Sequence, residues 1–180
     1  MGSIDFKAFQ LVNQFAGRWH LLDTLMKAVA KAGPLAFVLP FFYLWFKYGD
    51  DGKRAALLAI ISVAVAMGVN QIIGHVYFRP RPFASHQVNL LFPKSPDPSF
   101  PSDHATFSFA IASLIWFFDR RVGGIAIALG LLIAISRVFV GLHYPIDVLS
   151  GAFIGSATGI LVWRMRGKLD RLTLLATWHH

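Results

Sequence analysis

The chain has 180 residues, 56% of them hydrophobic and only 14% charged, with a mean hydropathy of +0.56. A soluble domain usually carries about 25% charged residues, so this composition excludes a disordered chain and argues against an ordinary soluble enzyme. Seventeen Lys and Arg residues stand against nine acidic residues, all of them Asp, and give a net charge of +8. In so apolar a chain this charge indicates anionic lipid headgroups as partners and not nucleic acid. The absence of cysteine excludes disulfides and cysteine nucleophiles.

The first apolar stretches predict an interfacial helix and a bent first span. In residues 4–16 the apolar side chains recur at every third position: Phe6, Phe9, Val12 and Phe15. This pattern predicts an amphipathic helix, too short to cross a bilayer, that lies at the membrane interface or packs on the protein. Residues 21–48 predict the first transmembrane span, kinked near Pro34. Residues 49–52 predict a turn.

Four further apolar stretches predict the remaining spans, which are residues 55–78, a short helix at 105–118, then 122–140 and 145–163. The interval 79–101 is polar and holds most of the prolines, so we expect a long loop there. The predicted fold is an all-α, polytopic membrane helix bundle of about five transmembrane helices plus an N-terminal interfacial helix, forming one domain over residues 1–180. Gly151, Gly155 and Gly159 recur every four residues and predict close packing of the last span.

The parity of five spans places the two polar loops around residues 79–101 and 140–144 on one membrane side. Nine Lys and Arg residues fall on the other side, at the turns near residues 50 and 120 and after residue 163. The excess of Lys and Arg on this other side becomes clear when Arg79, Arg81 and Arg137 are set aside as site residues. By the positive-inside rule, the C-terminal end is then cytoplasmic and the long loop faces outward.

Three polar clusters converge on that outward face: Arg79 with Arg81, Ser102 with Asp103 and His104, and Arg137 with His143 and Asp147. Ser102 is a favourable N-cap for a helix that begins at Asp103, and backbone N–H groups at such a helix start favour an anion. His143 and Asp147 are four residues apart, so an Asp–His pair that fixes the ring tautomer is expected. Ionisable groups that share a cavity at span ends predict a functional site.

These residue types predict phosphoryl chemistry. Arginine side chains and backbone N–H groups bind a phosphate and the charge that develops on it. One His can attack phosphorus, and the other can protonate the leaving oxygen and then activate water. Because the sequence offers no carboxylate cluster for Mg²⁺ or Zn²⁺, the mechanism is predicted to need neither a metal nor a cofactor.

The three clusters resemble the signature motifs of the type-2 phosphatidic acid phosphatase (PAP2) superfamily, in order and separation, over residues 55–165. The matching residues are Arg81-Pro82, Pro101-Ser102 with His104, and Ser136-Arg137 with His143 and Asp147. Within the superfamily, the short chain, Asn70-Gln71 and Arg81-Pro82-Phe83 resemble bacterial undecaprenyl-diphosphate phosphatases of the bacitracin-resistance type.

The resemblance implies a role for each matching residue. His143 would be the nucleophile, Asp147 its orienting partner and His104 the general acid, while Arg81, Ser102 and Arg137 would bind phosphate. Two positions depart from the family pattern, because Gly74 stands where a Lys is usual and Asp103 where a Gly is usual. His75 and Arg79 are candidates to replace the missing Lys at the substrate, and Asp103 lies beside the expected phosphate.

The resemblance implies an enzyme of the bacterial plasma membrane that hydrolyses undecaprenyl diphosphate to undecaprenyl phosphate and phosphate through a phosphohistidine intermediate. Such an activity belongs to cell-wall (peptidoglycan) biogenesis and bacitracin resistance. The same motifs fit a phosphatidate or phosphatidylglycerol-phosphate phosphatase, because they contact phosphate and not the lipid tail. A non-enzymatic membrane protein, such as a small transporter, is the third interpretation, and the catalytic set argues against it. The oligomeric state is left open.

Overall fold

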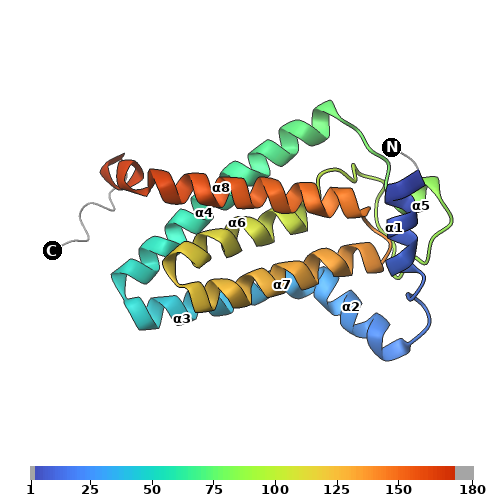
Figure 1. The fold of residues 1–180 in the computed structure, drawn as a ribbon, viewed down its shortest axis with the longest axis horizontal. Coiled ribbons are helices and arrows are strands. Elements are labelled where there is room, and N and C mark those ends of the chain that lie inside the picture. The colour runs from blue at the N-terminus through green and yellow to red at the C-terminus, as the bar shows by residue number, and fades with distance from the viewer. Residues whose placement is uncertain (1–2, 173–180) are drawn as a thin grey trace.

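The computed structural model describes residues 3–172, and every regular element in that range is helical, which confirms the predicted all-α class (Figure 1). The elements are α1 (Ser3–Asn13), α2 (His20–Ala32), the 3₁₀ helix η1 (Gly33–Phe37), α3 (Val38–Tyr48), α4 (Asp50–Val76), α5 (Pro82–Ser85), α6 (Asp103–Phe118), α7 (Arg120–Phe139) and α8 (Pro145–Leu172). Four segments of this part of the chain are long and apolar enough to cross a membrane: His20–Tyr48, Asp50–Val76, Arg120–Phe139 and Pro145–Leu169. The predicted membrane bundle is thus confirmed.

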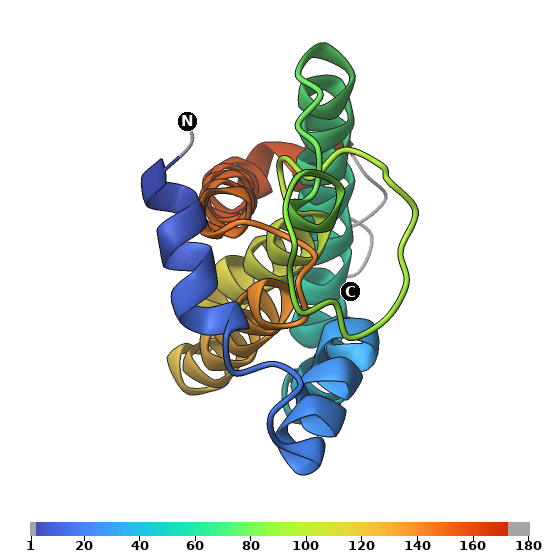
Figure 2. The same cartoon turned by 90° about the vertical axis from the view of Figure 1, so that its right-hand side faces the viewer.

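The predicted short third span, α6, is the central helix of the bundle. It has 16 residues and is about 24 Å long at 1.5 Å per residue, less than the roughly 30 Å of a hydrocarbon core. It packs against α4, α7 and α8, which surround it in the end-on view (Figure 2). Most of its residues from Ala105 to Ile115 are buried. Its neighbours therefore cover most of this short helix.

The glycine repeat on α8 brings this helix close to α6. A side chain at Gly155 would collide with the backbone of Thr106 and reach 2.8 Å from the backbone nitrogen of Ala110 on α6. Gly151 and Gly159 face the same helix in the same way. The predicted close packing of the last span is confirmed, and it draws the start of α8 against the start of α6, where the backbone N–H of Ser102 donates to the Asp147 carbonyl at 3.0 Å.

The first span is bent where the sequence predicts it. Proline has no N–H to donate and its ring obstructs the preceding turn, so an α-helix cannot run evenly through Pro34. The chain tightens into η1 at Gly33 and resumes as α3 at Val38. The predicted kink is confirmed as a short 3₁₀ segment between two α-helices.

Two predicted boundaries are wrong. The turn expected at residues 49–52 is confined to Gly49, whose φ of 54° reverses the chain, and α4 already begins at Asp50. Asp50 and Asp51 suit a first helical turn because their charge interacts favourably with the helix dipole. The last helix continues past the predicted end at residue 163, since α8 includes the basic residues that follow and ends at Leu172.

The polar clusters gather at one end of the bundle. The C-terminal ends of α4 and α7 and the N-terminal ends of α6 and α8 lie there, with α1 and α5 across them (Figures 1 and 2). The α3–α4 and α6–α7 junctions lie at the opposite end (Figure 1). The predicted common face of the motif loops is therefore confirmed. The helix predicted over residues 4–16 is α1, and its placement in a membrane interface stays a prediction.

Candidate active site

Arg81 and His143 form the centre of the site. Arg81, just before α5, places its Nη1 atom 3.0 Å from Nε2 of His143 and donates from the same nitrogen to the Leu142 carbonyl at 3.0 Å. The other side of the guanidinium binds the Asp97 carboxylate in a two-pronged contact, with Nε–Oδ1 and Nη2–Oδ2 distances of 3.0 Å. Burial alone would raise the pKa of Asp97, but the hydrogen bond and charge of Arg81 outweigh it and hold that pKa below its ordinary value. Arg81 is thus fixed beside Nε2 of the histidine ring.

The His143 ring is oriented by a backbone carbonyl. Its Nδ1 atom lies 2.8 Å from the carbonyl oxygen of Ser99. Because a carbonyl can only accept, Nδ1 carries the proton and the lone pair of Nε2 faces the site. The ring is 2% exposed, and this burial, which outweighs the attraction of Asp147, lowers the pKa of His143 to about 4. His143 is therefore neutral, with the tautomer that a nucleophile at Nε2 requires.

Asp147 lies near Nδ1 of this ring without a direct hydrogen bond to it. The distance from Nδ1 of His143 to Oδ2 of Asp147 is 3.8 Å, longer than a hydrogen bond allows. The carboxylate, which is completely buried, instead accepts from the Ser99 hydroxyl at 2.6 Å, the Tyr144 backbone N–H at 2.8 Å and the Arg79 guanidinium at 2.5 Å. Asp147 thus acts on the histidine through its charge and through Ser99.

Sequence reasoning missed Asp97, which binds Arg81, and it also missed Ser99. Its carbonyl binds His143 and its hydroxyl binds Asp147, so one residue spans the expected Asp–His pair. Its own N–H donates to the Arg79 carbonyl at 2.8 Å. Ser99 lies in a proline-rich loop with no periodic pattern, and its nearness to the Pro101-Ser102 motif was the one available signal.

Two buried donors beside this centre lack partners. Among the side chains that the structure describes, the buried polar atoms without a hydrogen bond are Ser102 Oγ, Ser108 Oγ and Arg137 Nε. Ser102 occupies the predicted N-cap position of α6, yet its hydroxyl makes no capping bond. Arg137 reaches the site from the end of α7, where Nη1 donates to the Ala30 carbonyl at 2.8 Å. Unpaired buried donors are costly, so their grouping near a helix N-terminus favours an anion.

His104 follows in the first turn of α6, half-buried. The His143 ring and the guanidinium groups of Arg137 and Arg81 lie near it, and the two guanidinium charges act on it. The structure thus brings together both histidines, Arg81, Ser102 and Arg137, with Asp147 behind them, as the sequence predicts.

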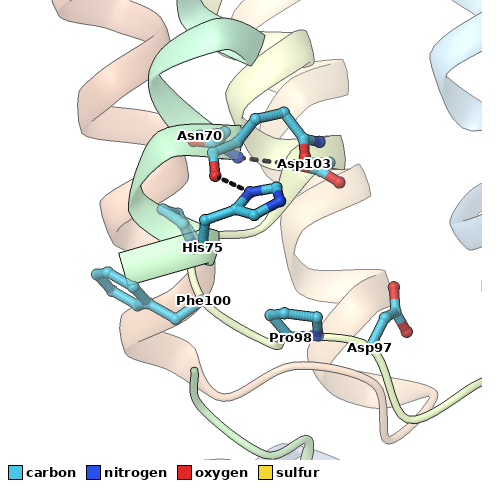
Figure 3. A pocket seen from close by; sticks show the side chains of 9 residues that line it. Asn70, His75, Asp97, Pro98, Phe100 and Asp103 are labelled. Atoms are coloured by element: carbon cyan, nitrogen blue, oxygen red, sulfur yellow. Dashed lines mark hydrogen bonds between the residues drawn. The ribbon is translucent and has the colours of Figure 1, made fainter. Parts of the chain in front are cut away.

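Asp103 and His75 line a neighbouring cavity of about 280 Å³ between α4 and the loop that carries Asp97 (Figure 3). The Asp103 carboxylate is turned toward α4, where it accepts from Asn70 Nδ2 at 2.9 Å. His75, at the end of α4, is exposed and its Nδ1 lies 2.7 Å from the Gln71 carbonyl. Gly74, which stands where the family has a Lys, lines the same cavity.

Arg79, a candidate to replace the missing Lys, is bound by two carboxylates. Its guanidinium lies between the carboxylates of Asp147 and Asp5. Burial alone would lower the pKa of Arg79, but the two carboxylates raise it above its ordinary value. Within residues 4–169, no three His or Asp side chains form a group that could ligate a metal ion.

Comparison with known proteins gives concordant matches. The family model of the PAP2 superfamily matches residues 55–171. The undecaprenyl-diphosphatase BcrC of Bacillus subtilis is 32% identical over 92% of this chain and 86% of its own length. The putative undecaprenyl-diphosphatase YbjG of Escherichia coli is 31% identical over 92% of this chain and 85% of its own length.

Two solved structures share the fold. The Aquifex aeolicus LpxE structure superposes with a TM-score of 0.77 at 27% identity, covering 90% of this chain and 96% of LpxE. A transmembrane PAP2-type phosphatidylglycerolphosphate phosphatase from Bacillus subtilis superposes with a TM-score of 0.71 at 22% identity, covering 94% of this chain and 87% of that protein.

Proposed function

The chain belongs to the PAP2 superfamily as a membrane lipid phosphatase, and from this premise we propose that it hydrolyses undecaprenyl diphosphate to undecaprenyl phosphate and inorganic phosphate. The observation that carries the chemistry is the neutral His143, with Nε2 facing a group of buried donors. The lipid is inferred from two relatives matched over more than 80% of their length, whose names state undecaprenyl-diphosphatase activity.

The reaction runs in two displacements. Nε2 of His143 attacks the terminal phosphorus, the bond to the bridging oxygen breaks, and a proton from His104 supports departure of the lipid monophosphate. His104 then takes a proton from water, the water attacks the phosphohistidine, and inorganic phosphate leaves with His143 restored. Arg81, Arg137 and the Ser102 hydroxyl hold the terminal phosphate during both steps.

Asp147 and Ser99 support the positive charge that the His143 ring gains in the intermediate. The carboxylate lies 3.8 Å from Nδ1 and the Ser99 carbonyl 2.8 Å from it, so both stabilise an imidazolium-like ring. The cationic and N–H groups named above balance the negative charge of the phosphate. The proposal therefore includes activity without a metal.

A substrate panel tests the proposal. The purified protein in detergent is assayed for phosphate release from undecaprenyl diphosphate, phosphatidate and phosphatidylglycerol phosphate, each with and without EDTA. We expect the highest kcat/KM on undecaprenyl diphosphate and no loss of activity with EDTA. The His143→Ala protein, purified identically, reports any contaminating phosphatase. A preference for either glycerolipid would contradict the proposed substrate, and a complete loss restored by Mg²⁺ would contradict the metal-free mechanism.

The proposal also places the enzyme in the bacterial plasma membrane with its site facing outward. The support is the charge bias of the two loop sets and their position at opposite ends of the bundle (Figure 1). Because the chain has no cysteine, single substitutions report sidedness. Ser95→Cys, in the exposed part of the long loop, should react with an impermeant thiol reagent on intact cells. Asp51→Cys, exposed at the other end, should react only after the membrane is opened, and the reverse pattern would contradict the orientation.

A further inference from the structure

The Arg79 guanidinium joins two carboxylates from opposite ends of the chain. Nη1 donates to Oδ1 of Asp147 on α8, and Nη2 donates to Oδ2 of Asp5 on α1 at 2.6 Å. The three side chains are 10% exposed in Arg79, 16% in Asp5 and 0% in Asp147. This Asp5–Arg79–Asp147 network is thus largely shielded from water. Buried ion pairs of this kind are screened by salt much less than ion pairs at a surface.

Asp5 also holds the start of the helix that carries Asp147. Its Oδ1 atom accepts from the Ile146 backbone N–H at 3.1 Å, which is one of the N–H groups that the first turn of α8 leaves without an intrahelical partner. The Arg79 guanidinium packs over the Tyr144 ring, 4.1 Å from its centroid. One carboxylate of α1 therefore fixes both Arg79 and the backbone next to Asp147.

The charges in the network affect how strongly Asp147 can stabilise the His143 ring during the reaction. If Asp147 alone faced Arg79, most of its negative charge would be directed at the guanidinium. A second carboxylate on Arg79 shares that positive charge and leaves Asp147 freer to stabilise the His143 ring. The effect is largest when the ring becomes positive, so it acts on turnover more than on substrate binding.

We propose that Asp5 is a positioning residue for the reaction: through Arg79 it sets the place and the effective charge of Asp147, and through Asp147 the reactivity of His143. The N-terminal helix is then part of the catalytic unit, although the matched PAP2 region begins only at residue 55. This inference rests on the proposed function, in which His143 is the nucleophile.

Contacts other than those of Asp5 also hold helix α1 in place. Asn13 donates from Nδ2 to the Phe139 carbonyl at 2.8 Å and to the Asn89 carbonyl at 2.9 Å. Phe9 is buried with its ring 5.8 Å from that of Tyr144. Asp5→Asn is nearly isosteric, so it removes the charge while these contacts hold the helix.

The test is the kcat of Asp5→Asn on the lipid phosphate that the wild type hydrolyses best. Hydrogen bonds to charged groups are worth on the order of tenfold to a hundredfold in rate, so we expect kcat to fall by about that factor while KM changes less than about twofold. Asp23→Asn is the matched control, because Asp23 is another buried carboxylate of the N-terminal region, accepts from the Gly17 N–H at 3.0 Å and makes no contact with the site. It should keep wild-type kcat.

A double-mutant cycle shows whether the effect passes through Arg79. In an Arg79→Gln background, Asp5→Asn should cost less than about twofold, because the link is already broken. Arg79→Lys, which keeps the charge but cannot bridge both carboxylates, is the second background if the first does not fold, and the same result is expected. Wild-type kcat in Asp5→Asn, or an undiminished loss in these backgrounds, would overturn the inference. If His143→Ala stays active, the proposed function itself fails, which separates the two outcomes.

Discussion

Replacing Ser99 with Ala removes one hydroxyl from the centre of the site and leaves the backbone carbonyl that binds His143. The hydroxyl donates to Asp147 Oδ2 at 2.6 Å and is buried. After its loss, Tyr144 and Arg79 are the remaining donors to the carboxylate among those that the structure describes.

The magnitude follows from the charge on the acceptor. A buried hydrogen bond to an ionised group contributes about 1.5–3 kcal/mol, and every 1.4 kcal/mol corresponds to about tenfold in rate. We therefore expect Ser99→Ala to lower kcat by about tenfold to a hundredfold, with a small change in KM, because Ser99 touches Asp147 and His143 and none of the proposed phosphate ligands.

The assay is steady-state phosphate release by purified protein in detergent, together with the thermal unfolding midpoint. Ser108→Ala is the matched control, since its hydroxyl is equally buried on α6 but has no hydrogen-bond partner, and it should retain full kcat. A Ser99→Ala protein that unfolds like the wild type and turns over within about twofold of it would refute the link between Ser99, Asp147 and the nucleophile, given the expected loss.

Four further changes test the rest of the account. His143→Ala should lose several orders of magnitude in kcat because the nucleophile is gone, and Asp147→Asn should be severe but measurably active; activity of His143→Ala within about tenfold of wild type would remove it from that role. Gly155→Leu should lower the thermal unfolding midpoint sharply or prevent folding, because its side chain would meet the backbone of Ala110; an unchanged midpoint would contradict the tight α6–α8 contact. Acid should destabilise the wild type by up to about 3 kcal/mol as the pH falls from about 6.5, the pKa of a histidine in the unfolded chain, to about 4, the pKa of His143 in the folded protein. The reason is that the unfolded chain takes up the proton first. His143→Ala should lack this part of the acid dependence, measured as unfolding midpoint against pH.

The helices could be predicted from the sequence because the bilayer demands long apolar runs, and Pro34 and Pro145 mark a bend and a start that backbone chemistry enforces. The ends of the helices were less predictable where charged residues lie within a helix. The basic residues after Trp163 suggested a tail, yet α8 continues through Arg164 and Arg166, since long basic side chains can extend toward headgroups without ending a helix.

The site was predictable to the extent that its residues share local motifs. The spacing from Ser136 to Asp147 indicated His143 and Arg137, and the start of α6 indicated Ser102 and His104. Contacts between distant segments left no local signal. Asp5 lies 74 residues from Arg79 in the chain, and Ser99 lies 44 from His143, so only the packed bundle brings them together. Arg79, expected near phosphate, is bound by the carboxylates of Asp147 and Asp5, and no local motif links Asp5 to the site.

The most direct test of the central claim is to trap the phosphorylated enzyme. Purified protein is mixed with undecaprenyl diphosphate, quenched with base within one turnover, digested and analysed by mass spectrometry for the site of phosphorylation. We expect one phosphoryl group on the peptide that contains His143, and none in the His143→Ala protein. A phosphoryl group on His104, or rapid turnover with no phosphorylated peptide, would contradict the assignment of His143 as the nucleophile.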